Sequence, residues 1–103
     1  MKFEVEGEAP IDQPTAAQVD EGLRTLQPSE RTFAILARED WTYIQTAFDG
    51  DGTFVLEYQD GSLEQHYRAS RPLLLQEVIG AFQSYLRQDG AWRSGILWER
   101  LEL

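Results

Sequence analysis

Alternation of polar and apolar residues marks much of this chain as β-strand. Phe3 and Val5 alternate with glutamates, which predicts a short strand at the edge of a sheet. Residues 7–13 should follow as a loop. Residues 32–37 are almost wholly apolar and β-prone, a pattern typical of an interior strand that is covered on both faces.

Two turn sequences predict an antiparallel meander of three further strands. The turn at residues 49–52, Asp-Gly-Asp-Gly, should join strands at 42–48 and 53–59. The Asp60-Gly61 pair should then make a two-residue turn into a strand at 62–68. These turns are the strongest local signals in the chain.

The turns also predict which strand residues face each other. The first places Phe48 opposite Phe54, and the second places Glu57 opposite Glu64. This register predicts a core face formed by Ile44, Phe48, Phe54, Leu56, Tyr58, Leu63 and Tyr67. The opposite face should carry Tyr43, Gln45, Glu57, Glu64, His66 and Arg68.

Two segments carry apolar residues at helical spacing. The first helix should begin at Pro14 and end at Pro28, and Gly22 weakens it by about 1 kcal/mol relative to alanine. The second should begin at Pro72 and stop at Gly90, where a left-handed residue can end a helix. The apolar stripes are Ala16, Val19, Leu23 and Leu26 in the first helix, and Leu75, Val78, Ile79, Phe82, Tyr85 and Leu86 in the second.

The end of the chain should return to the sheet. Residues 92–103 are expected to form the last strand, with Leu97, Leu101 and Leu103 on one side and Trp98, Arg100 and Glu102 on the other. Two amphipathic helices on one face of a mostly antiparallel sheet of about five strands would give a two-layer α+β fold. Residues 1–103 are expected to form one such domain.

Composition and charge exclude several classes of function. The 103 residues include 18 Asp and Glu against nine Lys and Arg, a net charge of −9. Nucleic acids and anionic membranes are therefore unexpected partners, because they attract basic surfaces. Cysteine is absent and the apolar runs are too short to cross a bilayer. We expect a cytoplasmic protein whose acidic surface holds a basic protein or simply keeps the chain soluble.

Few residues can carry catalysis or bind a metal. His66 is the single histidine, and no Gly-x-Ser-x-Gly motif or usual zinc spacing is present. Residues 49–52 are similar to the start of a calcium loop, but the third acidic position and the distal glutamate are missing. We expect no catalytic residue, metal or cofactor, and no enzyme.

One polar constellation leaves an alternative open. Gln45, Glu57, Glu64, His66 and Arg68 share the open face of the predicted sheet. Neighbouring carboxylates raise the pKa of one of them, so Glu57 and Glu64 could form an acid–base pair beside His66. A solvated face, with Arg68 and His66 balancing the acids, is the simpler interpretation, since a flat face excludes no water.

A binding surface is the better prediction. Trp98 is the best candidate for an exposed aromatic side chain, a type enriched at interfaces. Further acids that could meet a basic partner are Asp20 and Glu21 on the first helix. The candidate partner-binding residues are Gln45, Glu57, Glu64, His66, Asp49, Asp51 and Trp98.

Several short segments within residues 10–103 carry a resemblance to a known family. They are Phe33-Ala34-Ile35-Leu36, Tyr43-Ile44-Gln45-Thr46-Ala47, Val55-Leu56-Glu57-Tyr58, His66-Tyr67, Glu77-Val78 through Tyr85, Trp92 and Trp98-Glu99. In these segments the chain resembles small bacterial immunity proteins of polymorphic toxin systems, many of them uncharacterised. The resemblance implies an intracellular protein that binds and blocks a cognate toxin, with no catalysis of its own.

Three functions follow from the sequence. The first is a non-enzymatic protein-binding domain, an immunity protein that neutralises a basic toxin. The second is a domain that self-associates through its last strand or its sheet face. The third is an enzyme or small-ligand carrier that uses Glu57, Glu64 and His66. The chain should act as a monomer or homodimer.

Overall fold

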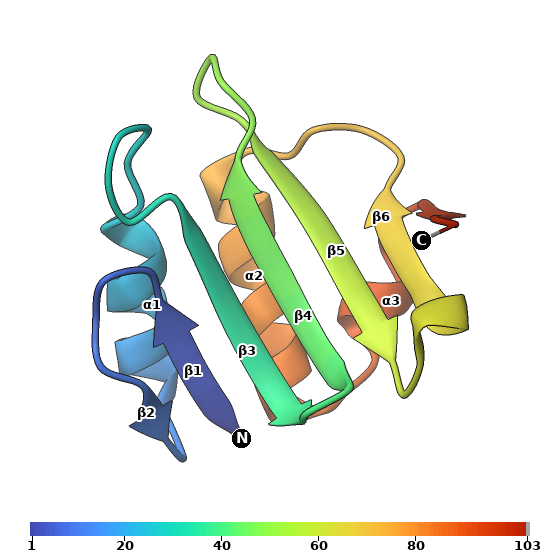
Figure 1. Cartoon of the computed structure of the whole chain (residues 1–103), viewed down its shortest axis with the longest axis horizontal. Helices are drawn as coiled ribbons and strands as arrows, with labels where there is room; N and C mark the ends of the chain where they lie inside the picture. Colours follow the sequence, from blue (N-terminus) through green and yellow to red (C-terminus); the bar gives the residue numbers. More distant parts are fainter. Residues whose placement is uncertain (103) are drawn as a thin grey trace.

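A computed structural model describes residues 1–102 as one antiparallel sheet with helices along one side (Figure 1). The strands are β1 (Lys2–Val5), β2 (Ile11–Asp12), β3 (Phe33–Glu39), β4 (Thr42–Phe48), β5 (Phe54–Asp60), β6 (His66–Ala69) and β7 (Trp98–Arg100). The helices are α1 (Ala16–Arg24), α2 (Leu75–Arg87) and the short α3 (Ala91–Ser94), and a 3-10 turn η1 (Leu63–Gln65) precedes β6. The predicted α+β class is confirmed, but the sheet has seven strands rather than about five.

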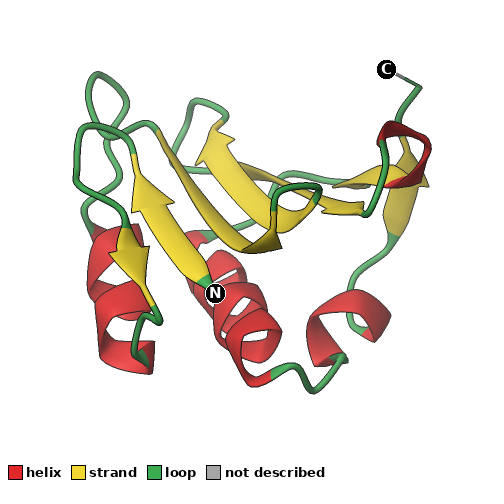
Figure 2. Ribbon diagram, turned by 60° about the horizontal axis from the view of Figure 1, so that its bottom comes forward, coloured by secondary structure: helices red, strands yellow, loops and turns green. Residues whose placement is uncertain are grey.

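The helices cover one face of the sheet and leave the other face open (Figure 2). The covered face packs buried strand residues against the apolar stripes of α1 and α2. Its members are Phe3, Val5, Ala34, Leu36, Ile44, Phe54, Leu56 and Tyr58 from the strands, and Val19, Leu23, Val78, Ile79, Phe82 and Tyr85 from the helices. The core of the molecule is therefore a single layer between sheet and helices.

β3 is an interior strand, as predicted, but only one of its faces is covered. It lies between β1 and β4 in the strand order. Ala34 and Leu36 are fully buried against the helices, whereas Phe33 is 37% exposed and Ile35 is half-buried on the open face. The prediction that both faces are covered is wrong, because the α-helices within residues 1–102 all lie on one side of the sheet (Figure 2).

The N-terminal strand is not at the edge of the sheet. Residues 7–13 were expected to be a loop, but they contain the two-residue strand β2, which pairs Ile11 with Phe3 and Asp12 with Lys2. β2 is therefore the edge of the sheet, and its shortness limits pairing with another chain.

The β4–β5 hairpin has the predicted register. Phe48 pairs with Phe54, and further along the hairpin Ile44 pairs with Tyr58. Gly50 and Gly52 in the connecting turn have φ of 74° and 75°, a left-handed conformation that glycine adopts without strain. The turn chemistry thus predicts this pairing correctly.

The β5–β6 connection is wider than predicted. Glu57 pairs with Arg68 and not with Glu64, because residues 61–65 fold into a loop that contains η1. The Gln65 amide donates to the Ser62 carbonyl at 3.0 Å, which closes this turn. Leu63 is consequently 50% exposed, outside the core in which it was predicted to lie.

Both long helices begin after their prolines, not at them. Thr15 caps α1: its hydroxyl accepts from the Gln18 amide at 3.1 Å, and the Gln18 side chain accepts from the Thr15 amide at 2.9 Å. α2 begins at Leu75 and ends at Arg87. The next residue, Gln88, has a φ of 60° and is the left-handed cap that was expected at Gly90.

Residues 92–103 do not form one strand. The Asp89 carboxylate accepts hydrogen bonds from Ser84 and from the Ala91 amide, and a short helix, α3, follows. Only Trp98–Arg100 then pairs with β6, while Leu97 is 80% exposed and Leu103 lies outside the described residues. Trp98 is half-buried, because its ring packs edge-on against Tyr58 at 4.7 Å. The prediction of Trp98 as an exposed aromatic is therefore wrong.

Gly22 allows α1 to lie close to β1. A Cβ at this position would lie 2.8 Å from Cζ of Phe3, a buried ring that also packs edge-on against Phe82. We expect Gly22→Ala to lower the free energy of unfolding by about 1–3 kcal/mol through overpacking, although alanine favours helices.

Gly80 provides the matched control in α2, because nothing lies within 4 Å of the Cβ that alanine would add there. Gly80→Ala should raise stability by roughly 0.5–1 kcal/mol. Urea denaturation of both variants is the measurement, and equal stabilisation by the two changes would contradict the close approach of α1 to β1.

Candidate binding site on the open face of the sheet

The strand register arranges the open-face side chains in three rows across the sheet. The first row is Phe33, Ala47 and Val55; the second is Glu4, Ile35, Gln45, Glu57 and Arg68; the third is Lys2, Ala37, Tyr43, Gln59 and His66. Apolar side chains gather on β3 and its neighbours at one end of the face. Polar side chains gather over β5 and β6.

The polar cluster, defined as Gln45, Glu57, Gln59, His66 and Arg68, is centred on the Glu57 carboxylate. Its Oε1 accepts from His66 Nε2 at 2.7 Å and from Gln45 Nε2 at 3.2 Å. Its Oε2 accepts from Arg68 Nη2 at 2.6 Å and Nε at 2.9 Å. One side chain of β5 thereby joins β4 and β6, and the charge of the glutamate is balanced by its neighbours.

His66 and Gln59 extend this cluster below the surface. His66 is 4% exposed and Gln59 is 2% exposed, although both lie in rows of the open face. The Nδ1 atom of His66 lies 2.9 Å from Gln59 Oε1. Both ring nitrogens thus lie within hydrogen-bond distance of side-chain oxygens, Gln59 Oε1 and Glu57 Oε1.

The surroundings of Glu57 favour its ionised form. Burial acts to raise the pKa of Glu57, but hydrogen bonds from His66, Arg68 and Gln45 outweigh this effect and hold the pKa below its ordinary value. A carboxylate whose two oxygens are already occupied has little capacity left to accept a proton from a substrate. Glu57 is therefore built into the sheet rather than presented to solvent.

Beside the polar cluster lies an apolar strip, defined as Phe33, Ile35, Ala47 and Val55. Together with Gln45 and Glu57 it lines a shallow hollow of about 320 Å³. These four residues were not among the predicted site residues. The almost wholly apolar run of residues 32–37 contains Phe33 and Ile35 of the strip, but such a run predicts a strand that is covered on both faces.

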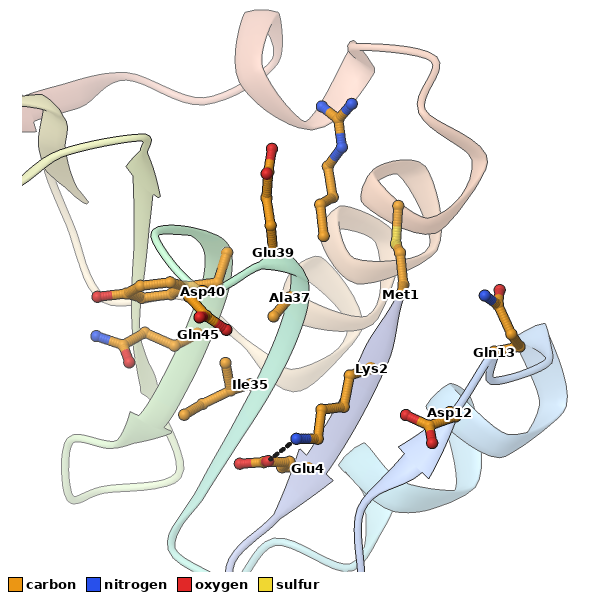
Figure 3. A pocket seen from close by; sticks show the side chains of 12 residues that line it. Met1, Lys2, Glu4, Asp12, Gln13, Ile35, Ala37, Glu39, Asp40 and Gln45 are labelled. Atoms are coloured by element: carbon orange, nitrogen blue, oxygen red, sulfur yellow. Dashed lines mark ion pairs between the residues drawn. The ribbon is translucent and has the colours of Figure 1, made fainter.

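A second, larger hollow adjoins the strip, and both hollows are lined by Ile35 and Gln45 (Figure 3). Its volume is about 660 Å³, and it is lined from β1, β2, β3 and β4. Four carboxylates surround it, those of Glu4, Asp12, Glu39 and Asp40, and Glu4 is 3.6 Å from the Lys2 ammonium. The open face is thus apolar at the end that carries Phe33, Ala47 and Val55, and mostly acidic around the second hollow.

The structure separates the predicted site residues. Gln45, Glu57 and His66 lie together in the polar cluster, whereas Glu64 is exposed on η1, so the adjacent carboxylate pair with Glu57 does not form.

The remaining predicted acids and Trp98 are dispersed. Asp49 and Asp51 are exposed at the tip of the β4–β5 hairpin, and Trp98 packs in the aromatic group around Tyr58. On α1, Glu21 is exposed, while Asp20 accepts from Arg24 at 3.0 Å.

Comparison of the chain with protein-family models, with curated proteins and with solved structures found no match. The resemblance to immunity proteins therefore stays a prediction. Within residues 1–102, every helix is too short or too polar to cross a bilayer.

The Glu57 interactions predict a stability that depends on pH. Glu57→Gln removes the charge that holds Arg68 and His66, and should lower the free energy of unfolding at pH 7 by roughly 1–3 kcal/mol. Because the pKa of Glu57 is lowered on folding, its contribution is complete above the ordinary value of 4.5 and is lost as the pH falls through the folded value. The difference between wild type and variant should therefore shrink as the pH falls below 4.5.

Glu64→Gln is the matched control, since it removes the same charge from an exposed turn. Thermal or urea unfolding should show a near-zero effect of this change at pH 7. Equal destabilisation by the two substitutions would mean that net charge, rather than the polar cluster, controls stability.

Proposed function

We propose that this chain is a non-enzymatic, intracellular protein-binding domain that docks a basic protein on its open sheet face, as an immunity protein docks its cognate toxin. The observation that carries the proposal is the apolar strip, four apolar side chains in register on a face that no helix covers. When a partner covers such a strip, the free energy of the complex falls by about 25 cal/mol for each Å² of apolar surface removed from water.

The arrangement around the strip supports a protein partner. Protein interfaces combine an apolar centre with a polar rim, and the strip borders the polar cluster and, through Ile35, the acidic hollow. Phe33 is the largest side chain of the strip and is 37% exposed, which suits it to fill a pocket on a partner.

The charge of the chain supports a basic partner. A net charge of −9 draws a positively charged protein toward the surface and speeds association at low salt. Carboxylates lie near both ends of the strip, with Glu4 on β1 next to Ile35 and Asp49 at the hairpin tip beyond Ala47. The same charge opposes self-association, because two copies of the chain repel each other.

The polar cluster supports binding over catalysis. The Glu57 and His66 side chains are 2.7 Å apart, the distance of a functional acid–base pair. However, Gln45, Arg68 and Gln59 occupy their remaining hydrogen-bonding positions. A general base needs a free position directed at its substrate, so a role in holding the sheet fits these residues better.

The test uses the protein products of the genes that flank this one. Each product is purified and mixed with the chain, and affinity is measured by calorimetry. We expect a 1:1 complex with one basic product, and Phe33→Lys or Val55→Thr should weaken it at least tenfold, because both changes make the strip polar.

Leu74→Lys is the control for charge, since Leu74 is 60% exposed at the start of α2 on the covered side of the sheet. It should change the affinity less than twofold. Binding that is indifferent to Phe33→Lys but sensitive to Leu74→Lys would place the interface elsewhere. Absence of binding by every flanking product would contradict the immunity-protein proposal.

A further inference from the structure

Trp41 projects from the tight turn between β3 and β4, at one end of the sheet. Its side chain is 58% exposed, a high value for an indole. A partner that covers the indole would remove its large apolar surface from water. Glu39, Asp40, Trp41, Thr42 and Gly61 line a hollow of about 430 Å³ at this end. We call this group of five residues the Trp41 corner.

The backbone of the Trp41 corner is held by the polar cluster. The Trp41 carbonyl accepts from the Gly61 amide at 2.9 Å and from Gln59 Nε2 at 3.3 Å. Gln59 is in turn fixed by His66 at 2.9 Å and by the Tyr43 hydroxyl at 3.3 Å. The turn that carries the exposed indole is therefore fixed before binding, which lowers the entropy cost of binding.

In the described part of the chain the carboxylates of the Trp41 corner form no ion pair, although Arg38 precedes them in the chain and lines the neighbouring hollow with them. Among the ion pairs within residues 1–102, none includes Glu39 or Asp40. The nearby Asp60 is 3.6 Å from Arg93, but Arg93 is also engaged over the Tyr58 ring, 5.2 Å from its centre. Glu39 and Asp40 thus line the same hollow as the exposed indole, and both carboxylates lack an ion-pair partner among residues 1–102.

An indole face beside carboxylates matches the chemistry of one side chain. The planar guanidinium of arginine stacks on aromatic rings and donates paired hydrogen bonds to carboxylates. A lysine ammonium offers the charge without the planar stacking, and phosphate groups would be repelled. Charge complementarity therefore favours an arginine-bearing segment as the occupant.

We propose that the Trp41 corner is an anchor site for an arginine side chain of a basic protein partner, with the guanidinium stacked on Trp41 and hydrogen-bonded to Asp40 or Glu39. The site lies outside the apolar strip and does not depend on it. A partner that covers the strip and carries an arginine near its edge would engage both, which adds specificity to the interaction.

The experiment is a titration followed by the indole N–H signals of the ¹⁵N-labelled protein. The chain has three tryptophans, so three signals are expected, and Trp41→Phe identifies one of them. The probe is the peptide acetyl-Gly-Arg-Gly-Arg-Gly-amide, and the matched peptide replaces each arginine with neutral, nearly isosteric citrulline. We expect the Trp41 signal to shift in a saturable manner with a millimolar dissociation constant, while those of Trp92 and Trp98 stay in place. The citrulline peptide should bind at least fivefold more weakly.

A pair of charge-matched variants tests the role of the carboxylate. Asp40→Asn should weaken arginine-peptide binding at least threefold, whereas Asp51→Asn, at the opposite end of the sheet, should leave it unchanged. Unchanged Trp92 and Trp98 signals verify that each variant is folded.

Equal binding of the citrulline peptide, equal effects of the two variants, or a Trp41 signal that shifts with protein concentration alone would each overturn the proposal. The last result would indicate a second copy of the chain as the occupant. Because the peptide is the only ligand, these outcomes are separate from any failure of flanking gene products to bind the strip.

Discussion

The two long helices, α1 and α2, cover one face of the seven-stranded sheet and leave the other face open (Figure 2). The rest of the structure depends on this constraint. The largest fully buried side chains, such as Phe3, Leu36 and Phe82, lie in one layer between the sheet and the helices α1 and α2. Within residues 1–102, no helix covers Phe33 and Ile35 on the other face. An apolar patch exposed in this way is a usual mark of an interaction surface.

The polar residues of the open face form their hydrogen bonds with one another. Glu57 is charged in the middle of a sheet, and three neighbouring side chains on β4 and β6 satisfy both of its oxygens. The cluster continues through His66 and Gln59 to the carbonyl of Trp41. A single hydrogen-bonded chain thus links the middle of the sheet to an exposed aromatic residue at its end. Glu57, one of the acids that look most functional in the sequence, is the one that this network uses for structure.

Local turn chemistry explains what the sequence could predict. The glycines of the Asp49–Gly52 turn determine the β4–β5 pairing, and the helical stripes identify both long helices. The β5–β6 pairing differs from the prediction by four residues, because Asp60-Gly61 begins a wider loop, which the hydrogen bond from the Gln65 amide to the Ser62 carbonyl closes. The strip was missed for a related reason. An apolar run has the same appearance whether the protein's own helix or another protein covers its second face.

The most direct test of this account is the solvent accessibility of the strip in the free monomer. A neutral gadolinium chelate added to the methyl-labelled protein enhances the relaxation of methyl groups that solvent can reach. The account predicts strong enhancement at Ile35, Ala47 and Val55, and little at Ile44, Leu56 and Val78, at a concentration where light scattering gives the monomer mass. Protection of Ile35 and Val55 equal to that of Ile44 in the monomer would contradict it.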